Sequence, residues 1–273
     1  MDAQTLRAQA FKALHERKGA FVIPNPWDAG SAKMLASLGF EALATTSAGY
    51  AFSRARPDGG LTLDETLSNV QAIVAASDLP VAVDLENGFA DSPAECAKSI
   101  VRAAQVGAVG GSIEDATGRE EGPIYCFEHA VARIEAAVAA ARGLPYPFTL
   151  TARAENFLHG NPDLADTIRR LQAFAEAGAD VLYAPGLRSA EDVLAVVRAV
   201  APKPVNVLMS GGLKLSVEQL SEMGGKRITV GSALALAAYG EFFRAAQEIC
   251  DAGTFGFTSR SMPFQQANSL FKD

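Results

Sequence analysis

A recurring junction is the feature that most constrains the fold of this 273-residue chain. Segments of helical periodicity end on a glycine, and a short apolar run follows at once. A glycine that ends a helix just before a buried strand is typical of α/β proteins. The junction occurs at Gly39, Gly107, Gly178 and the pair Gly224-Gly225. The first two intervals are about twice the length of one strand-plus-helix unit, so we expect further strands between the junctions.

Eight short apolar runs are predicted to be strands: 21–23, 42–45, 81–84, 109–114, 148–151, 181–183, 205–208 and 228–230. Helical segments alternate with them, most clearly at 63–76, 93–105, 128–141, 163–177 and 190–200. Eight strand-plus-helix units in about 250 residues are typical of a (β/α)8 TIM barrel. The rival is a doubly wound open sheet, but the chain lacks a GxGxxG motif between a strand and a helix. We therefore predict a single (β/α)8 barrel domain over residues 1–273.

Composition excludes several functional classes. The chain has 24 Lys and Arg against 31 Asp and Glu, a net charge of −7. Nucleic-acid binding needs a clustered cationic surface, and no such cluster is present. The three cysteines, Cys96, Cys126 and Cys250, have no CxxC spacing, which favours a reducing compartment. No apolar run reaches the roughly 18 residues of a membrane helix, and the N-terminus has no signal-peptide core, so we expect a cytoplasmic protein without membrane contact.

The C-terminal part, about 232–273, differs from the rest. A long alanine-rich helix is predicted over 232–250, and the tail after it contains four phenylalanines among turn residues. This is more apolar surface than a solvated terminus should carry. We expect the helix and tail to pack on a partner subunit.

Acidic residues follow two of the predicted strands. Chemistry in a barrel lies at the carboxyl ends of its strands. Asp84 and Glu86 are two residues apart, so on an extended strand both would point the same way, with Glu114 beside them on the next strand. Three converging carboxylates repel each other unless a cation neutralises them, and an oxygen-only set suits Mg²⁺ or Mn²⁺. The alternative is that Asp84 caps a loop and Glu114 pairs with a basic residue.

An anion site is predicted beside the acids. Arg153, at the end of the fifth predicted strand, offers a fork of donors that fits a carboxylate or phosphate. A structural salt bridge to Glu155 or another acid is the competing interpretation. The turn Ser47-Ala48-Gly49 could add a hydroxyl and backbone N–H groups for the same anion. None of the lysines lies at a strand end, which disfavours Schiff-base chemistry.

Several of these segments together carry a resemblance to a known family. They are Asn25-Pro26-Trp27-Asp28-Ala29, Thr45-Thr46-Ser47-Ala48-Gly49, Pro57-Asp58-Gly59, Val83-Asp84-Leu85-Glu86-Asn87-Gly88, Ser112-Ile113-Glu114-Asp115 and Ala152-Arg153-Ala154. Through these segments, taken in this order, the chain resembles the isocitrate lyase and phosphoenolpyruvate mutase superfamily over nearly its whole length. The tail segment Ser261-Met262-Pro263-Phe264 is similar to the family's C-terminus.

The resemblance implies a Mg²⁺-dependent enzyme that acts on a small 2-oxo acid or enol-carboxylate through an enolate. It also implies a C-terminal helix exchanged between subunits, in a homo-oligomer that is a dimer or, as a dimer of dimers, a homotetramer. Carried over by position, Asp84 holds the metal, Asp58, Glu86 and Glu114 order its water shell, and Ser47, the Ala48 amide and Arg153 take the substrate carboxylate. Gly49 and Asn206 complete the predicted substrate contacts.

One departure from the family pattern narrows the reaction. The family's carbon–carbon lyases carry a Lys-x-Cys-Gly-His loop after the fourth strand, and its phosphonopyruvate enzymes tend to place Lys and Asn there. Here the stretch is Asp115-Ala116-Thr117-Gly118-Arg119-Glu120-Glu121-Gly122-Pro123, without cysteine. We therefore predict lyase or decarboxylase-type chemistry on an oxaloacetate-like substrate. The alternatives are phosphonopyruvate chemistry, with Arg54, Arg56 or Arg119 as phosphoryl contacts, and a non-catalytic 2-oxo acid binding protein.

Overall fold

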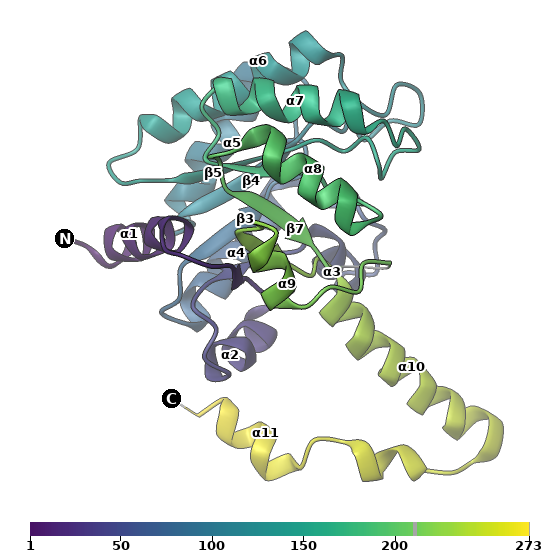
Figure 1. Cartoon of the computed structure of the whole chain (residues 1–273). Helices are drawn as coiled ribbons and strands as arrows, with labels where there is room; N and C mark the ends of the chain where they lie inside the picture. The colour runs from purple at the N-terminus through teal and green to yellow at the C-terminus, as the bar shows by residue number, and fades with distance from the viewer. Residues whose placement is uncertain (210–211, 273) are drawn as a thin grey trace.

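The computed structural model describes residues 1–209 and 212–272. Eight parallel strands form one curled sheet in the order β1-β8-β7-β6-β5-β4-β3-β2 (Figure 1). Its edges meet where the Ala44 N–H donates a 3.1 Å hydrogen bond to the Pro24 carbonyl. The strands are β1 (Phe21–Val22), β2 (Leu43–Ala44), β3 (Val81–Asp84), β4 (Gly110–Glu114), β5 (Thr149–Arg153), β6 (Val181–Tyr183), β7 (Val205–Leu208) and β8 (Arg227–Thr229). The predicted (β/α)8 fold is confirmed.

Helices follow the strands and surround the sheet. They are α1 (Ala3–Glu16), α2 (Ala29–Ser37), α3 (Ser47–Ser53), α4 (Leu63–Ala76), α5 (Pro93–Gln105), α6 (Phe127–Arg142), α7 (Leu164–Glu176), α8 (Ala190–Val200), α9 (Val217–Glu222), α10 (Ala233–Ala252) and α11 (Phe264–Leu270), with a short 3-10 helix η1 (Gly256–Arg260). The N-cap hydroxyls of Thr62, Ser92 and Ser189 accept from the N3 backbone of α4, α5 and α8. Sequence analysis predicted these three helices with the same bounds, because such caps fix where a helix starts.

The junction glycines have the backbone conformation that the sequence pattern requires. Gly39, Gly107, Gly178 and Gly224 have φ angles of 85°, 98°, 103° and 88°. Residues with a Cβ rarely adopt this left-handed region, whereas glycine does so at little cost. At Gly107 a Cβ would also lie 2.7 Å from a methyl group of Val74. Glycine therefore lets the chain leave α5 sharply enough to enter β4.

Three clusters of buried apolar side chains stabilise the described part of the barrel, the smallest of them around Leu43 and Ile73. The largest cluster lies between the sheet and the outer helices and includes Ile100, Ile134, Leu150 and Phe174. A smaller cluster around Phe11 of α1 lies at the amino ends of the strands. Because Phe11 and its neighbours close this end of the barrel, the interior cavity opens toward the carboxyl ends of the strands.

The C-terminal arm, α10 through α11, extends away from the barrel. Figure 1 shows α10 leaving the barrel wall and α11 returning toward α2. Ala235 is the buried residue of α10, while Phe242 and Phe243 are 72% and 66% exposed. The arm thus presents the apolar surface that the sequence predicted, and its packing on a partner subunit remains a prediction. None of the described helices has the length and apolar character needed to cross a membrane.

Candidate active site

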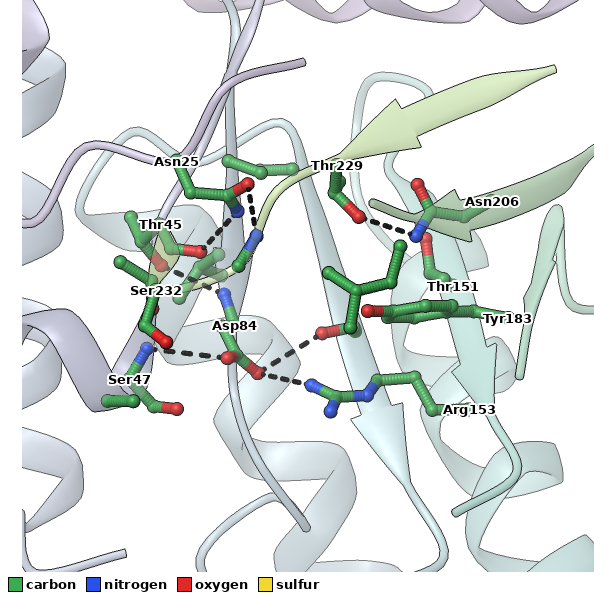
Figure 2. Close-up of a pocket in the computed structure, with 18 of the residues that line it drawn as sticks. Asn25, Thr45, Ser47, Asp84, Thr151, Arg153, Tyr183, Asn206, Thr229 and Ser232 are labelled. Carbon is green, nitrogen blue, oxygen red and sulfur yellow. Dashed lines mark hydrogen bonds and ion pairs between the residues drawn. The ribbon is translucent and has the colours of Figure 1, made fainter. Parts of the chain in front are cut away.

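The polar side chains that follow the strands surround a cavity of about 190 Å³ inside the mouth of the barrel (Figure 2). Its lining includes Ser47, Ala48, Asp58, Asp84, Arg153 and Asn206 of the predicted site. A wider mouth of about 750 Å³ lies beside it and is lined by Glu86 and Glu114 as well as by Asp58 and Arg153. Gly49 lines neither space, because it is buried and its N–H donates to the Thr46 hydroxyl that caps α3.

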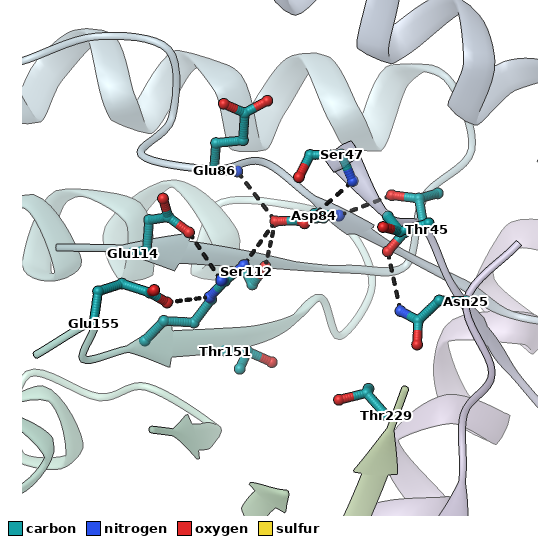
Figure 3. Close-up of polar contacts among 12 residues, drawn as sticks. Asn25, Thr45, Ser47, Asp84, Glu86, Ser112, Glu114, Thr151, Glu155 and Thr229 are labelled. Carbon is teal, nitrogen blue, oxygen red and sulfur yellow. Dashed lines mark hydrogen bonds and ion pairs between the residues drawn. The ribbon is translucent and has the colours of Figure 1, made fainter. Parts of the chain in front are cut away.

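Asp84 ends β3 and is held by groups from two neighbouring segments. The Ser47 backbone N–H, at the start of α3, donates to its Oδ2 at 3.3 Å. The Ser112 hydroxyl on β4 donates to its Oδ1 at 3.4 Å, and the Asp84 N–H donates to the Thr45 hydroxyl at 2.9 Å (Figure 3). These contacts orient the carboxylate into the cavity.

Arg153 pairs with three carboxylates at once. Its Nη1 lies 2.9 Å from Asp84, its Nη2 lies 3.1 Å from Glu114, and its Nε lies 2.8 Å from Glu155. Burial by itself would lower the pKa of Arg153, but the three acids raise it well above its ordinary value. The structural salt bridge that the sequence left open is therefore present, and Arg153 also lines the cavity where an anion would bind.

Glu86 departs from the expected geometry. The strand ends at Asp84, and Glu86 has a left-handed backbone with φ 48°. The expectation that Asp84 and Glu86 share one face of an extended strand is therefore wrong. Figure 3 shows the Glu86 side chain turned away from Asp84, while its N–H donates to Asp84 Oδ1 at 3.3 Å. Glu86 Oε1 is buried with no hydrogen-bond partner among the described residues.

The acids at the mouth raise one another's pKa. Burial, then Asp84 and Asp58, raise the pKa of Glu86 to about 8. Partial desolvation, then Asp84, raises the pKa of Asp58, whose Oδ1 accepts a 3.1 Å hydrogen bond from the Ser47 hydroxyl. Burial raises the pKa of Glu114 and brings that of Glu155 to about 7, although Arg153 opposes both shifts. Arg153 therefore does not neutralise all of these acids, and the raised pKa values favour their protonated forms while no cation is bound.

The predicted metal ligands do not form a closed cage. Within residues 1–209 and 212–272, no three His, Cys, Asp or Glu side chains lie close enough together to hold a metal between them. The donors suit a hard cation that keeps most of its water, since they are carboxylates and one of them has an unpartnered buried oxygen. Asp84 as a direct ligand, with Asp58, Glu86 and Glu114 bound to water, fits this arrangement.

Of a polar set deeper in the barrel, the sequence predicted Asn206 but missed Arg227, Thr151 and Thr229. Arg227, at the start of β8, donates through Nε to Asn206 Oδ1 and through Nη2 to the Thr151 hydroxyl, both at 2.9 Å. Asn206 Nδ2 donates to the Thr229 hydroxyl at 2.9 Å. Tyr183 packs against Arg153, with the guanidinium carbon 5.1 Å from the ring centroid. A charged residue directly before an apolar strand was the available signal for Arg227.

The loop after β4, which the family uses for its acid or base, is short and closed on itself. The Thr117 N–H donates to the Pro123 carbonyl at 2.8 Å, and the Thr117 hydroxyl donates to the Gly122 carbonyl at 2.8 Å. Arg119 reaches across to Asp91 of the preceding loop at 2.8 Å. Arg119 is therefore neutralised by an acid of this chain.

Comparisons with known proteins agree with this fold. A solved structure from Burkholderia cenocepacia J2315, provisionally described as a lyase/mutase, is 57% identical, with a TM-score of 0.97 and coverage of 100% of this chain and 98% of that one. Oxaloacetate decarboxylase from Paraburkholderia xenovorans is 30% identical over 76% of this chain and 69% of its own. Oxaloacetate acetylhydrolase, solved with oxalate, is 26% identical with a TM-score of 0.86 and covers 96% and 93%.

A further solved structure, 2,3-dimethylmalate lyase of the phosphoenolpyruvate mutase and isocitrate lyase superfamily, is 26% identical with a TM-score of 0.85 and covers 97% and 94%, which places the chain among the enzymes of that superfamily. More narrowly, residues 11–250 match the phosphoenolpyruvate phosphomutase family model. The chain belongs to that family, and the resemblance drawn from its sequence is confirmed.

Proposed function

We propose that this enzyme decarboxylates or hydrolytically cleaves a small 2-oxo dicarboxylic acid of the oxaloacetate type, with Mg²⁺ at the mouth of the barrel. The observation that carries the proposal is the surplus of acids there. Five carboxyl groups surround the guanidinium of Arg153: Asp58, Asp84, Glu86, Glu114 and Glu155. A buried acidic cluster of this kind is stabilised by a divalent cation.

The same cavity offers a place for the 2-oxo acid. The start of α3 brings Ser47 and the Ala48 amide to its wall, and Arg153 lies opposite. In this structure the N–H groups of Arg153 contact three acids. A substrate carboxylate would replace some of these acids as the partner of Arg153, and a bound cation would replace Arg153 as the partner of Asp84. Mg²⁺ bound there would act as a Lewis acid, polarising the 2-oxo group and stabilising the negative charge that develops on its oxygen.

The protein residues then bind, orient and shield the substrate. Ser47 and Arg153 fix the carboxylate next to the 2-oxo group, and Asn206, which lines the same cavity, lies near the other end of the molecule. Tyr183 covers the Arg153 guanidinium with an apolar ring, which strengthens each ion pair by excluding water. When the bond to the distal carboxylate breaks and CO₂ leaves, its electron pair is delocalised onto the 2-oxo oxygen as an enolate, which then takes up a proton from water to give pyruvate.

The short loop after β4 favours bond cleavage that needs no protein base. Aldol cleavage requires a base to take the proton of a hydroxyl, whereas loss of CO₂ does not. The loop from Asp115 to Pro123 carries no cysteine or histidine for that role. The names of two relatives, an oxaloacetate decarboxylase and an oxaloacetate acetylhydrolase, support the substrate class.

The test is a kinetic assay on purified protein. Release of pyruvate, for decarboxylation, and of oxalate, for hydrolytic cleavage, is followed from oxaloacetate with and without Mg²⁺, with the protein-free rate at each Mg²⁺ concentration subtracted. We expect turnover that EDTA abolishes and that falls by about 100- to 1,000-fold in Asp84→Ala, the range for the loss of one electrostatic anchor. Asp64→Asn, on an exposed ion pair between α4 and α5, is the control and should keep full activity.

Two results point to other functions. Turnover of phosphonopyruvate in place of oxaloacetate would show phosphonate chemistry. Against this reading, Arg56 and Arg119 are already held by Glu65 and Asp91, each at 2.8 Å. Saturable binding of 2-oxo acids without turnover of any would show a non-catalytic binding protein.

A further inference from the structure

Arg227 is a cation that the mechanism above does not use. It lies at the amino end of β8, is 4% exposed and lines the floor of the cavity. Its two hydrogen-bond partners, Asn206 Oδ1 and the Thr151 hydroxyl, are neutral. Within the described part of the chain no carboxylate forms an ion pair with it, and its Nη1 donates no hydrogen bond. A buried guanidinium without an anion is costly, so its presence calls for an explanation.

Arg153 and Arg227 differ in the charge of the groups that they contact. Both arginines line one cavity, but Arg153 contacts three acids at its mouth end whereas Arg227 contacts none at its floor. Burial lowers the pKa of Arg227 to about 10, with Tyr183 raising it and Arg153 lowering it. The side chain therefore keeps its charge at neutral pH at the floor of the cavity, whereas the carboxyl groups lie at its mouth.

The opposite wall leaves room for a ligand above Arg227. Ala44 on β2 and Ala82 on β3 line the same cavity with side chains that end at Cβ. The neighbouring Asn206 donates to Thr229, so the amide oxygen stays directed at Arg227 and holds the guanidinium in place. The cavity therefore offers space next to a positively charged guanidinium of fixed orientation.

We infer that Arg227 binds the distal carboxylate of the substrate and thereby selects dicarboxylic over monocarboxylic acids. This inference rests on the proposed function, because it places the 2-oxo acid end of the molecule at Ser47 and Arg153. The ligand spans from the mouth, where the cation and Arg153 hold one carboxylate, to the floor, where Arg227 holds the other.

The experiment compares ligands that differ in the distal group. Oxaloacetate and 2-oxobutyrate differ by a carboxylate in place of a methyl group, and succinate carries two carboxylates without the 2-oxo group. Dissociation constants for succinate and 2-oxobutyrate are measured by calorimetry, and kcat/KM is measured for oxaloacetate, on wild type and Arg227→Gln. Arg142→Gln, which removes an arginine paired with Asp180 outside the cavity, is the matched control.

We expect Arg227→Gln to weaken succinate binding and oxaloacetate kcat/KM by about 10- to 100-fold, the range for losing a hydrogen bond to a charged group. Binding of 2-oxobutyrate should stay within about threefold, and Arg227→Lys should restore part of the preference. Equal losses for all three ligands would mean that Arg227 only supports the barrel. Unchanged succinate binding would equally overturn the inference.

Two further outcomes separate this inference from the proposed function. Arg227-dependent succinate binding without turnover of any 2-oxo acid would leave the floor site standing and remove the reaction. Oxaloacetate turnover that Arg227→Gln leaves unchanged would do the reverse. If Arg227→Gln does not fold, Asn206→Asp places a carboxylate against Arg227 with little change of shape, and it should abolish the dicarboxylate preference in the same way.

Discussion

Arg153 on β5 reaches past the intervening strand β4 to place its Nη1 2.9 Å from Asp84 Oδ1 on β3. On the way, its Nη2 contacts Glu114, which ends β4. One side chain thus ties together the carboxyl ends of three neighbouring strands. The pair also sets the chemistry of the site. Arg153 would bind the substrate carboxylate and Asp84 would bind the metal, and the two side chains hold each other in place before either ligand binds.

Removing the charge of Arg153 should destabilise the protein as well as abolish substrate binding. In Arg153→Gln the carboxylates of Asp84, Glu114 and Glu155 lose their common partner, and the last is 2% exposed. Breaking a buried ion pair from one side costs about 3–5 kcal/mol. Urea unfolding of the metal-free protein at neutral pH measures this, and an unchanged midpoint would show that the ion pairs contribute nothing.

Replacing Glu86 by glutamine should have opposite effects on stability and on metal binding. The variant removes a carboxylate whose pKa is raised to about 8 by burial and by Asp84 and Asp58. We expect the metal-free protein to gain about 1–2 kcal/mol at neutral pH, as is common when a strained functional site is relaxed. Mg²⁺ affinity, measured by calorimetry, should fall. A loss of both would identify Glu86 as a structural residue.

The stability of the protein should fall in acid through His15. Burial, then the charge of Arg227, lowers the pKa of His15 to about 3, while its Nδ1–H donates to the Phe11 carbonyl at 2.8 Å. The unfolded chain therefore takes up the proton first as the pH falls through about 6.5. Stability is full above that pH and is lost toward pH 3, by about 1.4 kcal/mol per pH unit.

His15→Leu isolates this contribution. Leucine has a similar size, and the Phe11 carbonyl keeps its bond within α1, so the variant should fold. Urea unfolding at pH 7.5, 6.5 and 5.5 should show a smaller loss of stability in the variant than in wild type. Parallel pH profiles for the two proteins would exclude His15 as the source.

The C-terminal arm should hold an oligomer together. Phe242 and Phe243 are 72% and 66% exposed on α10, and burying two phenylalanines against a partner is worth about 2–3 kcal/mol each. We expect light scattering to give a mass of two or four chains of 28.6 kDa for wild type. The double variant Phe242→Glu, Phe243→Glu should be monomeric, while Gln105→Glu on α5 keeps the oligomer. A monomeric wild type would contradict the prediction.

The sequence predicted the frame of the molecule well, for identifiable physical reasons. Glycine junctions and helix caps are local signals, so all eight strands and the bounds of α4, α5 and α8 could be placed from neighbours in the chain. The residues around the cavity could also be named, since barrel strands deliver their ends to one face. The left-handed turn at Glu86 could not be predicted, because a glutamate there is an exception to backbone preferences.

Contacts between side chains across the barrel could not be predicted from the sequence either. These contacts are the ion pairs of Arg153 with Asp84 and Glu114 and the hydrogen bonds of Arg227 with Asn206 and Thr151. Each depends on how far a side chain reaches over its neighbours. The strand order gives no information about that reach. The magnesium ion, the homotetramer and the cytoplasmic location remain predictions.

The central claim is that Asp84 and Arg153 form a metal-dependent site for a 2-oxo acid, and calorimetry tests it most directly. Pyruvate, oxaloacetate, 2-oxoglutarate and phosphonopyruvate are titrated into wild type and Arg153→Ala, each with and without Mg²⁺. We predict that oxaloacetate binds wild type in the presence of Mg²⁺, and that binding disappears when either the metal or the Arg153 side chain is removed. Absence of binding for all four acids, or binding that neither change affects, would contradict the account.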